Sequence, residues 1–171
     1  MSSSRINLTW TDHASNESGF RIERSADAVT FTEIGVVGSN VTTYASTSLS
    51  AATQYWYRVR AYNAAGQSAY AGPANATTMP TKPSAPKSLI GTRQPGGITL
   101  TWTDTSSNET GFSIERSPDG HAFSQIATVA QNVSTYLDAS PGASSYVFYR
   151  VRAFNLAGYS GYSNKLKVLN Q

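Results

Sequence analysis

The sequence of 171 residues contains no cysteine, few charges and no long hydrophobic run. Without cysteine, neither a disulfide framework nor a thiolate metal site can form. Charged residues make up only 13% of the chain, which favours short, half-buried strands over charged amphipathic helices. No apolar run reaches about 18 residues, so no membrane insertion is expected. The N-terminus lacks the apolar stretch of about 7–15 residues that a signal peptide needs.

The chain also lacks any run of basic residues, although its net charge is +3. Residues 1–79 carry five arginines and five acidic residues, which cancel. Residues 84–171 carry seven basic and five acidic residues, and Lys82 supplies the remaining positive charge. Because nucleic-acid-binding proteins concentrate their positive charge on one surface, we do not expect a nucleic-acid partner.

Groups suited to catalysis are scarce. The two histidines, His13 and His121, occupy unrelated positions in predicted loops. No nucleophile elbow, zinc-protease motif or phosphate-binding glycine loop is present, and a small β-domain has no deep cleft in which to raise the pKa of a carboxylate. The sequence therefore predicts a protein that is not an enzyme and that uses no cofactor.

The chain repeats itself at an offset of 92 residues. About 35 of the first 79 positions are identical at this offset, without any gap. The matching pairs include Trp10 and Trp102, Gly19 and Gly111, Phe31 and Phe123, Tyr57 and Tyr149, and Tyr70 and Tyr162. A period near 90 has the size of a whole sandwich domain. The proline-rich segment between the copies is typical of a semi-stiff connector. We therefore predict one domain over residues 1–79, a linker over 80–86 and a second domain over 87–171.

Within each copy, apolar residues recur at every second position. This period is that of a strand with one buried face, and the intervening segments are rich in turn-forming residues. The sequence therefore predicts an all-β protein made of two seven-strand sandwiches. The predicted core residues are Trp10, Phe20, Ile22, Tyr55, Tyr57, Trp102, Phe112, Ile114 and Tyr149.

Both copies resemble the fibronectin type III family of immunoglobulin-like sandwiches. The resemblance rests on the segments GFRIERS (19–25), GFSIERS (111–117), YRVRAYN (57–63) and YRVRAFN (149–155), and on a tyrosine corner at Leu49, Thr53 and Tyr55. The style of these motifs is most similar to domains of secreted bacterial multidomain proteins. The resemblance therefore implies a location outside the cell or on its surface.

Each copy departs from the family pattern at one place. The second copy has Pro141, Ser145 and Val147 at the corner positions, and we expect Tyr146 to substitute from one position earlier. In the first copy only residues 1–5 precede Ile6, whereas residues 85–91 supply a first strand to the second copy. We therefore expect the first domain to lack strand A and the chain to be part of a longer protein.

The loop between the second and third strands of the family pattern offers one candidate site. Asp12, Asn16 and Glu17 recur as Asp104, Asn108 and Glu109. Clustered oxygen ligands suit calcium, but three oxygens fall short of the six to eight that calcium takes. The alternative is that Asp and Asn close turns through backbone amides while Glu pairs with an arginine. We favour this structural interpretation and assign no metal site.

The outward face of the longest predicted strand offers a second candidate site. If Tyr55, Tyr57 and Val59 point inward, their neighbours point outward. The outward residues are Trp56, Arg58, Arg60 and Tyr62 in the first copy and Phe148, Arg150, Arg152 and Phe154 in the second, with Arg21 and Glu23 alongside. Such a face could stack on a sugar or a protein partner. The alternative, which we favour, is a ladder of cation–π contacts and ion pairs that only covers the sheet.

Three functions follow as hypotheses. The first is a non-catalytic spacer or adhesion module whose partners are other domains of a parent chain or extracellular proteins. The second is a carbohydrate-binding accessory module of a secreted glycoside hydrolase that uses Trp56 and its neighbours. The third is self-association through the open strand edge of the first domain, since unpaired edges recruit strands.

Overall fold

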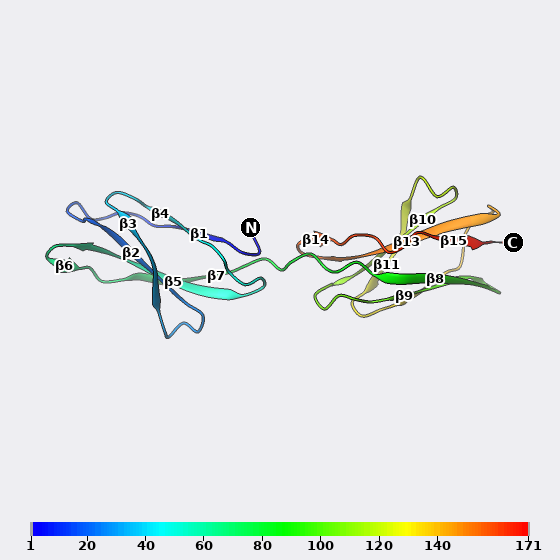
Figure 1. Cartoon of the computed structure of the whole chain (residues 1–171), viewed down its shortest axis with the longest axis horizontal. Coiled ribbons are helices and arrows are strands. Elements are labelled where there is room, and N and C mark those ends of the chain that lie inside the picture. Colours follow the sequence, from blue (N-terminus) through cyan, green and yellow to red (C-terminus); the bar gives the residue numbers. More distant parts are fainter. Residues whose placement is uncertain (1, 171) are drawn as a thin grey trace. The chain divides into compact units, whose positions relative to one another are not determined.

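The computed structural model describes residues 2–170, which form only strands, turns and loops (Figure 1). It divides into two compact units, residues 1–79 and 80–171. The predicted all-β class is confirmed. No helix in the described part of the chain could cross a membrane.

The first unit is a sandwich of a two-stranded and a five-stranded sheet. Its small sheet pairs β1 with β4, and in its large sheet β3, β2, β5 and β6 are neighbours in that order while β7 also pairs with β5. The strands are β1 (Ile6–Thr9), β2 (Gly19–Ser25), β3 (Thr32–Gly38), β4 (Thr43–Ser46), β5 (Gln54–Asn63), β6 (Gly66–Gln67) and β7 (Ala71–Thr77).

The second unit repeats this plan with one more strand. Its small sheet has the order β12-β9-β8, and in its large sheet β11, β10, β13 and β14 are neighbours while β15 also pairs with β13. The strands are β8 (Lys87–Gln94), β9 (Gly97–Thr103), β10 (Gly111–Ser117), β11 (Ser124–Ala130), β12 (Thr135–Asp138), β13 (Tyr146–Asn155), β14 (Gly158–Tyr159) and β15 (Leu166–Leu169). Within residues 2–79 no strand corresponds to β8, as the sequence predicted.

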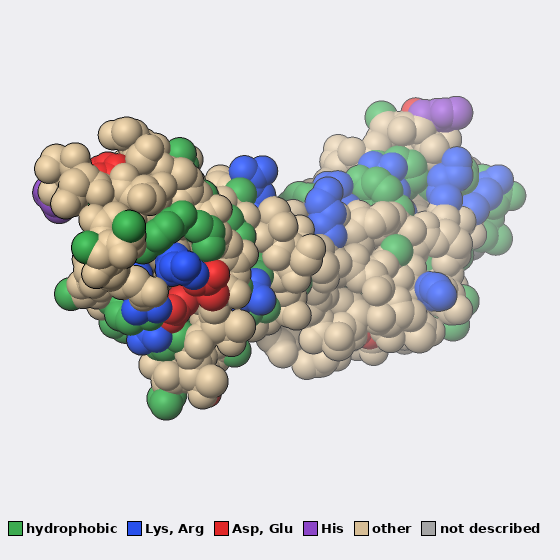
Figure 2. Space-filling model, turned by 60° about the vertical axis from the view of Figure 1, so that its left-hand side comes forward, with side chains coloured by type: hydrophobic (Ala, Val, Ile, Leu, Met, Phe, Trp, Pro, Cys, Tyr) green, Lys and Arg blue, Asp and Glu red, His purple; other side chains and the backbone are tan. Residues whose placement is uncertain are grey.

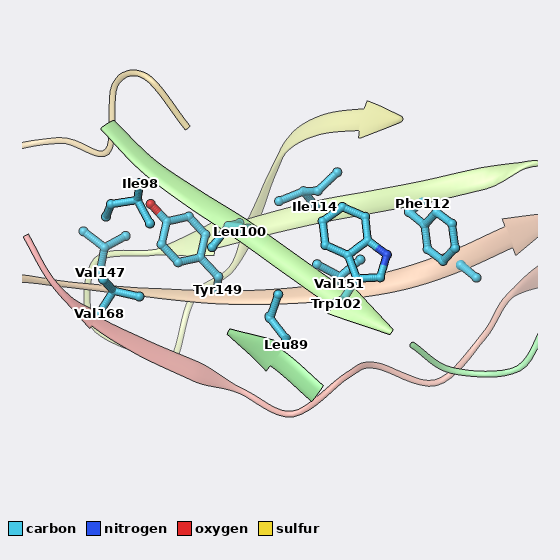
Figure 3. Close-up of a cluster of buried hydrophobic side chains, with 11 residues drawn as sticks. Leu89, Ile98, Leu100, Trp102, Phe112, Ile114, Val147, Tyr149, Val151 and Val168 are labelled. Atoms are coloured by element: carbon cyan, nitrogen blue, oxygen red, sulfur yellow. The ribbon is translucent and has the colours of Figure 1, made fainter. Parts of the chain in front are cut away.

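The alternation of apolar residues places the core between the two sheets of each unit. In the second unit one continuous cluster includes Leu89, Leu100, Trp102 and Tyr149 (Figure 3). Trp102 lies beside Phe112, with a distance of 5.6 Å between ring centroids. The predicted core residues are buried with one exception, because Trp10 of the first unit is only half-buried.

The predicted tyrosine corner is present in the first unit and absent from the second. The backbone amide of Ser50 donates to the Tyr55 hydroxyl over 3.1 Å. In the second unit the expected role of Tyr146 is wrong: its side chain is 45% exposed, while Val147 takes the buried position. The side-chain amide of Asn170 crosses this turn instead, donating to the carbonyls of Gly142 and Ser144 over 2.8 and 3.0 Å.

Candidate functional site

A buried glutamate organises the outer face of the large sheet in each unit. In the first unit, the register of β2 and β5 places Glu23 opposite Arg58 and Arg21 opposite Arg60. Glu23 accepts hydrogen bonds from Arg58 Nε over 2.8 Å and from the Tyr70 hydroxyl over 2.5 Å. Arg60 Nη2 lies 3.5 Å from Glu23 Oε1, the oxygen that Tyr70 also contacts. The carboxylate is therefore shared among three neighbours.

Aromatic rings enclose the arginines that hold this glutamate. The Arg58 guanidinium lies 4.2 Å from the Phe31 ring centroid and 3.9 Å from that of Tyr70. Arg60 lies 4.5 Å from the Tyr70 ring, so Tyr70 contacts two cations. Figure 2 shows basic, acidic and hydrophobic side chains gathered together on the first unit. Arg58, Arg60, Tyr70 and Glu23 therefore have their partners within the first unit.

The second unit reproduces this ladder with shorter ion pairs and a longer tyrosine hydrogen bond. Glu115 lies 2.6 Å from Arg150 Nη2 and 2.9 Å from Arg152 Nη2, and it accepts a hydrogen bond from the Tyr162 hydroxyl over 3.0 Å. Arg150 lies between the rings of Phe123 and Tyr162, at 4.2 and 3.7 Å. We refer to these stacked groups as the arginine ladder: Phe31, Arg58, Tyr70, Arg60 and Glu23 in the first unit, and Phe123, Arg150, Tyr162, Arg152 and Glu115 in the second.

In the first unit, the arginine ladder affects the charge state of Glu23. Burial acts to raise the pKa of Glu23, but the hydrogen bond from Tyr70 and the bonds and charge of Arg58 outweigh it, so the pKa lies below its ordinary value. The reciprocal effect appears on Tyr70, whose pKa is raised by its hydrogen bond to Glu23. The glutamate is therefore held ionised, which suits an ion-pair partner and not a proton donor.

The outward residues predicted from the sequence all lie half-buried on this face. The aromatic residues that stack on the arginines are Phe31, Tyr70, Phe123 and Tyr162, which sequence reasoning did not assign to it. These four residues recur at the 92-residue offset, which indicates a shared role in both units. The recurrence does not show on which face of the sheet a side chain lies. Arg21 is displaced toward Tyr62 and pairs with Glu33 over 2.8 Å.

Trp56 is the outward aromatic residue of the first unit that stands apart from the ladder. It pairs with Ser25 and Asn75 across the sheet, and no cation lies over its ring among the described residues. Its counterpart Phe148 lies 6.0 Å from Lys165 Nζ and 5.8 Å from Lys167 Nζ. The two units therefore differ at this position of the outer face.

The loop between the small and large sheets closes turns in both units. The amides of Ala14 and Ser106 donate to Asp12 and Asp104 over 2.9 Å each. The expected pairing of the glutamates with arginine is wrong. Both accept backbone amides instead, Glu17 from Asn40 over 3.1 Å and Glu109 from Asn132 over 3.2 Å.

The glutamates of this loop therefore stabilise a strained turn. Asn40 and Asn132 both have a φ of 60°, in the left-handed region that asparagine tolerates better than most residues. Within residues 2–170, no three acidic or histidine side chains gather to hold a metal ion.

A serine and an aspartate close a further turn in each unit, and this turn yields a pH-dependence prediction. Asp119 accepts hydrogen bonds from the His121 amide over 2.8 Å and from the Ser117 hydroxyl over 2.7 Å. These bonds lower its pKa from 3.8 to about 2. Because the pKa is depressed in the folded state, the stabilisation is present above about pH 4 and is lost as the pH falls through about 2.

We therefore expect Asp119→Asn to lower the free energy of unfolding most above about pH 4, with the difference from the unmodified chain shrinking toward pH 2. Denaturant unfolding at a series of pH values measures this difference. A difference that is constant across the series would contradict the assignment. Asp27, held in the same way by Ser25 and the amides of Val29 and Thr30, provides the matched position.

Comparison with known proteins identifies a family for the first unit. Residues 1–77 match the family model described as "Fibronectin type III domain". Exoglucanase B of Cellulomonas fimi is 29% identical over an alignment of 170 positions. The alignment covers 92% of this chain and 14% of that protein. The chain therefore spans about one seventh of this curated relative.

One solved structure shares the fold, and a second is similar with a lower TM-score. The chicken CNTN1 FN1–FN3 domains match 99% of this chain with a TM-score of 0.55 and 19% identity, and this chain covers 64% of theirs. A two-domain fibronectin type III segment of chicken tenascin matches 99% of this chain and 94% of its own, with a TM-score of 0.47 and 14% identity.

Proposed function

Because residues 1–77 match the fibronectin type III family and the second unit repeats their strand plan, we propose that the chain is a non-catalytic module that spaces neighbouring domains in a larger extracellular protein. The similarity to a short part of a bacterial exoglucanase supports a place in such a multidomain protein. The arginine ladder supports a non-catalytic role, because its glutamate is engaged by two arginines and a tyrosine in each unit. Other domains of the parent chain and extracellular proteins are the proposed partners.

The connector between the units carries the proposal. Up to Met79 the chain is held in the first unit, where the Met79 carbonyl accepts a hydrogen bond from the Ala52 amide over 3.1 Å. From Thr81 onward it is held in the second unit. The side-chain amides of Asn108 and Asn155 donate to the Thr81 carbonyl over 2.9 and 2.8 Å.

Only Pro80 therefore separates the two anchored segments. Proline has a fixed φ, so it contributes little freedom of its own. Further along the segment, Pro83 and Pro86 are buried in the second unit, and Thr105 donates to the Ala85 carbonyl over 2.7 Å. A connector held in this way favours a defined spacing over a flexible tether.

Distance measurement between spin labels tests the spacer proposal. The chain has no cysteine, so Val29→Cys and Leu156→Cys, at positions 81% and 77% exposed, place one label in each unit. We expect a narrow distance distribution, and we expect the pair Asn108→Ala and Asn155→Ala to broaden it by releasing Thr81. The matched pair Asn16→Ala and Asn63→Ala should leave the width unchanged. A distribution that is already broad in the otherwise unmodified chain would overturn the proposal.

A carbohydrate-binding role is the second candidate function. Two observations favour it: the similarity to an exoglucanase, and the ring of Trp56, which the arginine ladder does not use. Stacking of an aromatic ring on a sugar would require this ring to be accessible, and Trp56 is half-buried. The other aromatic residues on this face of the first unit are engaged by arginine, which leaves one ring in that unit where an extended sugar-binding face would need several.

Retention on insoluble polysaccharides separates the two functions. Under the spacer proposal we expect no retention of the chain on cellulose, chitin or xylan above that of a non-binding control protein. Retention that Trp56→Ala abolishes, and that Phe148→Ala does not, would establish the carbohydrate-binding alternative in its place.

A further inference from the structure

The second unit contains a buried carboxylate, Asp138, that is surrounded by hydrogen-bond donors. Asp138 ends β12 and is 4% exposed. Arg116 Nη1 donates to both of its oxygens over 2.9 and 3.1 Å, and the hydroxyl of Tyr149, a residue of the core cluster (Figure 3), donates over 2.7 Å. The Ser140 amide donates to the same carboxylate over 3.1 Å. These donors compensate the charge, as a buried anion requires.

The first unit keeps the arginine and the tyrosine of this cluster but not the carboxylate. At the 92-residue offset the two residues recur as Arg24 and Tyr57, whereas Ser46 stands at the position of Asp138. The register of β2 and β5 places Arg24 opposite Tyr57, as in the second unit. Arg24 Nη1 lies 3.4 Å from Ser46 Oγ. A hydroxyl carries no charge, so Ser46 does not compensate the guanidinium as a carboxylate does.

Two groups of the first unit therefore lack the partner that their counterparts have. The Tyr57 side chain is 4% exposed, and its hydroxyl makes no hydrogen bond among the described residues. Burial raises the pKa of Tyr57, while the Ser46 hydroxyl and the charge of Arg24 act against it, because both lie beside the phenol. The ion pairs of the first unit use other arginines, and Arg24 forms none within residues 2–170. A buried donor without an acceptor is costly.

The guanidinium of Arg24 is accessible from a hollow at the surface of the first unit. Arg24 and Tyr55 both line this hollow, and the guanidinium lies 5.2 Å from the centroid of the Tyr55 ring. Asp27 lines it as well, but its carboxylate accepts the Ser25 hydroxyl over 2.6 Å and two backbone amides of its own turn. Asp27 is therefore engaged elsewhere and forms no ion pair with Arg24.

We propose that the first unit binds a small monovalent anion of the size of chloride between Arg24 and Tyr57, where the second unit places the carboxylate of Asp138. The guanidinium would supply the positive charge, and the hydroxyls of Tyr57 and Ser46 would donate to the ion. Serine ends one atom short of the carboxylate oxygens of aspartate, so the substitution leaves space for a single ion and not for a large organic anion. The site is distinct from the arginine ladder, whose arginines already have a carboxylate partner.

Hydrogen exchange of the full chain in two salts tests the proposal. Sodium chloride is compared with sodium gluconate at equal ionic strength, because gluconate is too large for the site. Amides of β2 and β5 that exchange only when the first unit opens should exchange more slowly in chloride. For one site, a tenfold increase in chloride slows this exchange by at most about tenfold. The second unit should exchange at the same rate in both salts.

Two reciprocal variants assign the effect to this position. Ser46→Asp supplies the carboxylate from the chain itself and should remove the chloride dependence of the first unit. Asp138→Ser should introduce a chloride dependence into the second unit. Ser39→Asp is the charge-matched control, since it adds the same charge at an exposed turn of the first unit and should leave the chloride dependence unchanged.

Equal exchange of the first unit in the two salts would overturn the proposal, because the donors would then be satisfied without an anion. A chloride effect of equal size in both units, or one that persists in Ser46→Asp, would overturn it as well. The comparison of salts uses the unmodified chain, so the test does not depend on the folding of a variant. Its outcome is independent of the spacer function, which the distance measurement tests.

Discussion

Replacing Leu100 with alanine is expected to lower the free energy of unfolding of the second unit by about 2–5 kcal/mol. The Leu100 side chain is fully buried, and it contributes to the single cluster that joins both sheets. Its removal loses the transfer free energy of the deleted atoms and leaves a cavity in a closed sandwich. Neighbouring strands restrict how far the cavity can collapse, so the loss should lie within this range.

The matched substitution Leu8→Ala in the first unit is expected to cost clearly less. Leu8 occupies the same position of the repeat, but it is half-buried and lines a hollow between β1, β5 and β7. Hydrogen exchange followed by mass spectrometry reports the stability of each unit separately in the intact chain. Equal losses for the two substitutions would contradict this prediction, because they would show that the lower burial of Leu8 does not weaken the core of the first unit.

Replacing Glu115 with alanine is the second substitution with a large expected effect. The carboxylate is buried and accepts from two arginines and one tyrosine. Removing one partner of a buried ion pair costs about 3–5 kcal/mol, because the remaining charge is left uncompensated. The side chains of Arg150 and Arg152 are 29% and 25% exposed, and water can compensate them in part. We therefore expect a loss of about 2–3 kcal/mol.

Two controls define what the Glu115 result means. Glu23→Ala removes the equivalent carboxylate from the first unit, where Arg60 is more distant at 3.5 Å, so its cost should be somewhat smaller. Arg21→Ala removes an exposed ion pair with Glu33, which is expected to contribute little to stability. If Glu115→Ala lowers the free energy of unfolding no more than Arg21→Ala does, then the arginine ladder does not contribute measurably to stability.

The ladder also illustrates where sequence reasoning was sufficient. Alternation along residues 55–62 separated buried Tyr55 and Tyr57 from outward Arg58 and Arg60, because a strand has a strict period of two. That rule also anticipated arginine and glutamate side by side on neighbouring strands. It could not identify Tyr70 and Phe31 as the stacking rings, since these come from other segments and depend on how strands pair across the sheet.

Two local predictions failed for a common reason. Tyr146 was expected to replace the missing corner tyrosine, and Glu109 was expected to pair with arginine. The register of β13 instead points Tyr146 outward, while Glu109 reaches the amide of Asn132. Both outcomes depend on which backbone groups lie within reach after the sheets have packed, and spacing along the chain does not give those distances.

The sequence by itself determined the all-β class, the two copies of the domain, the alternating core and the strand that distinguishes the copies. These features follow from local periodicity and from a repeat, both of which can be read along one dimension. Only the tertiary structure decided that Thr81 is bound by Asn108 and Asn155, that the glutamates are enclosed by ladders, and that Asn16 and Asn63 line one hollow of the first unit. Each of these joins residues distant in sequence, and their meeting depends on sheet register and sandwich packing.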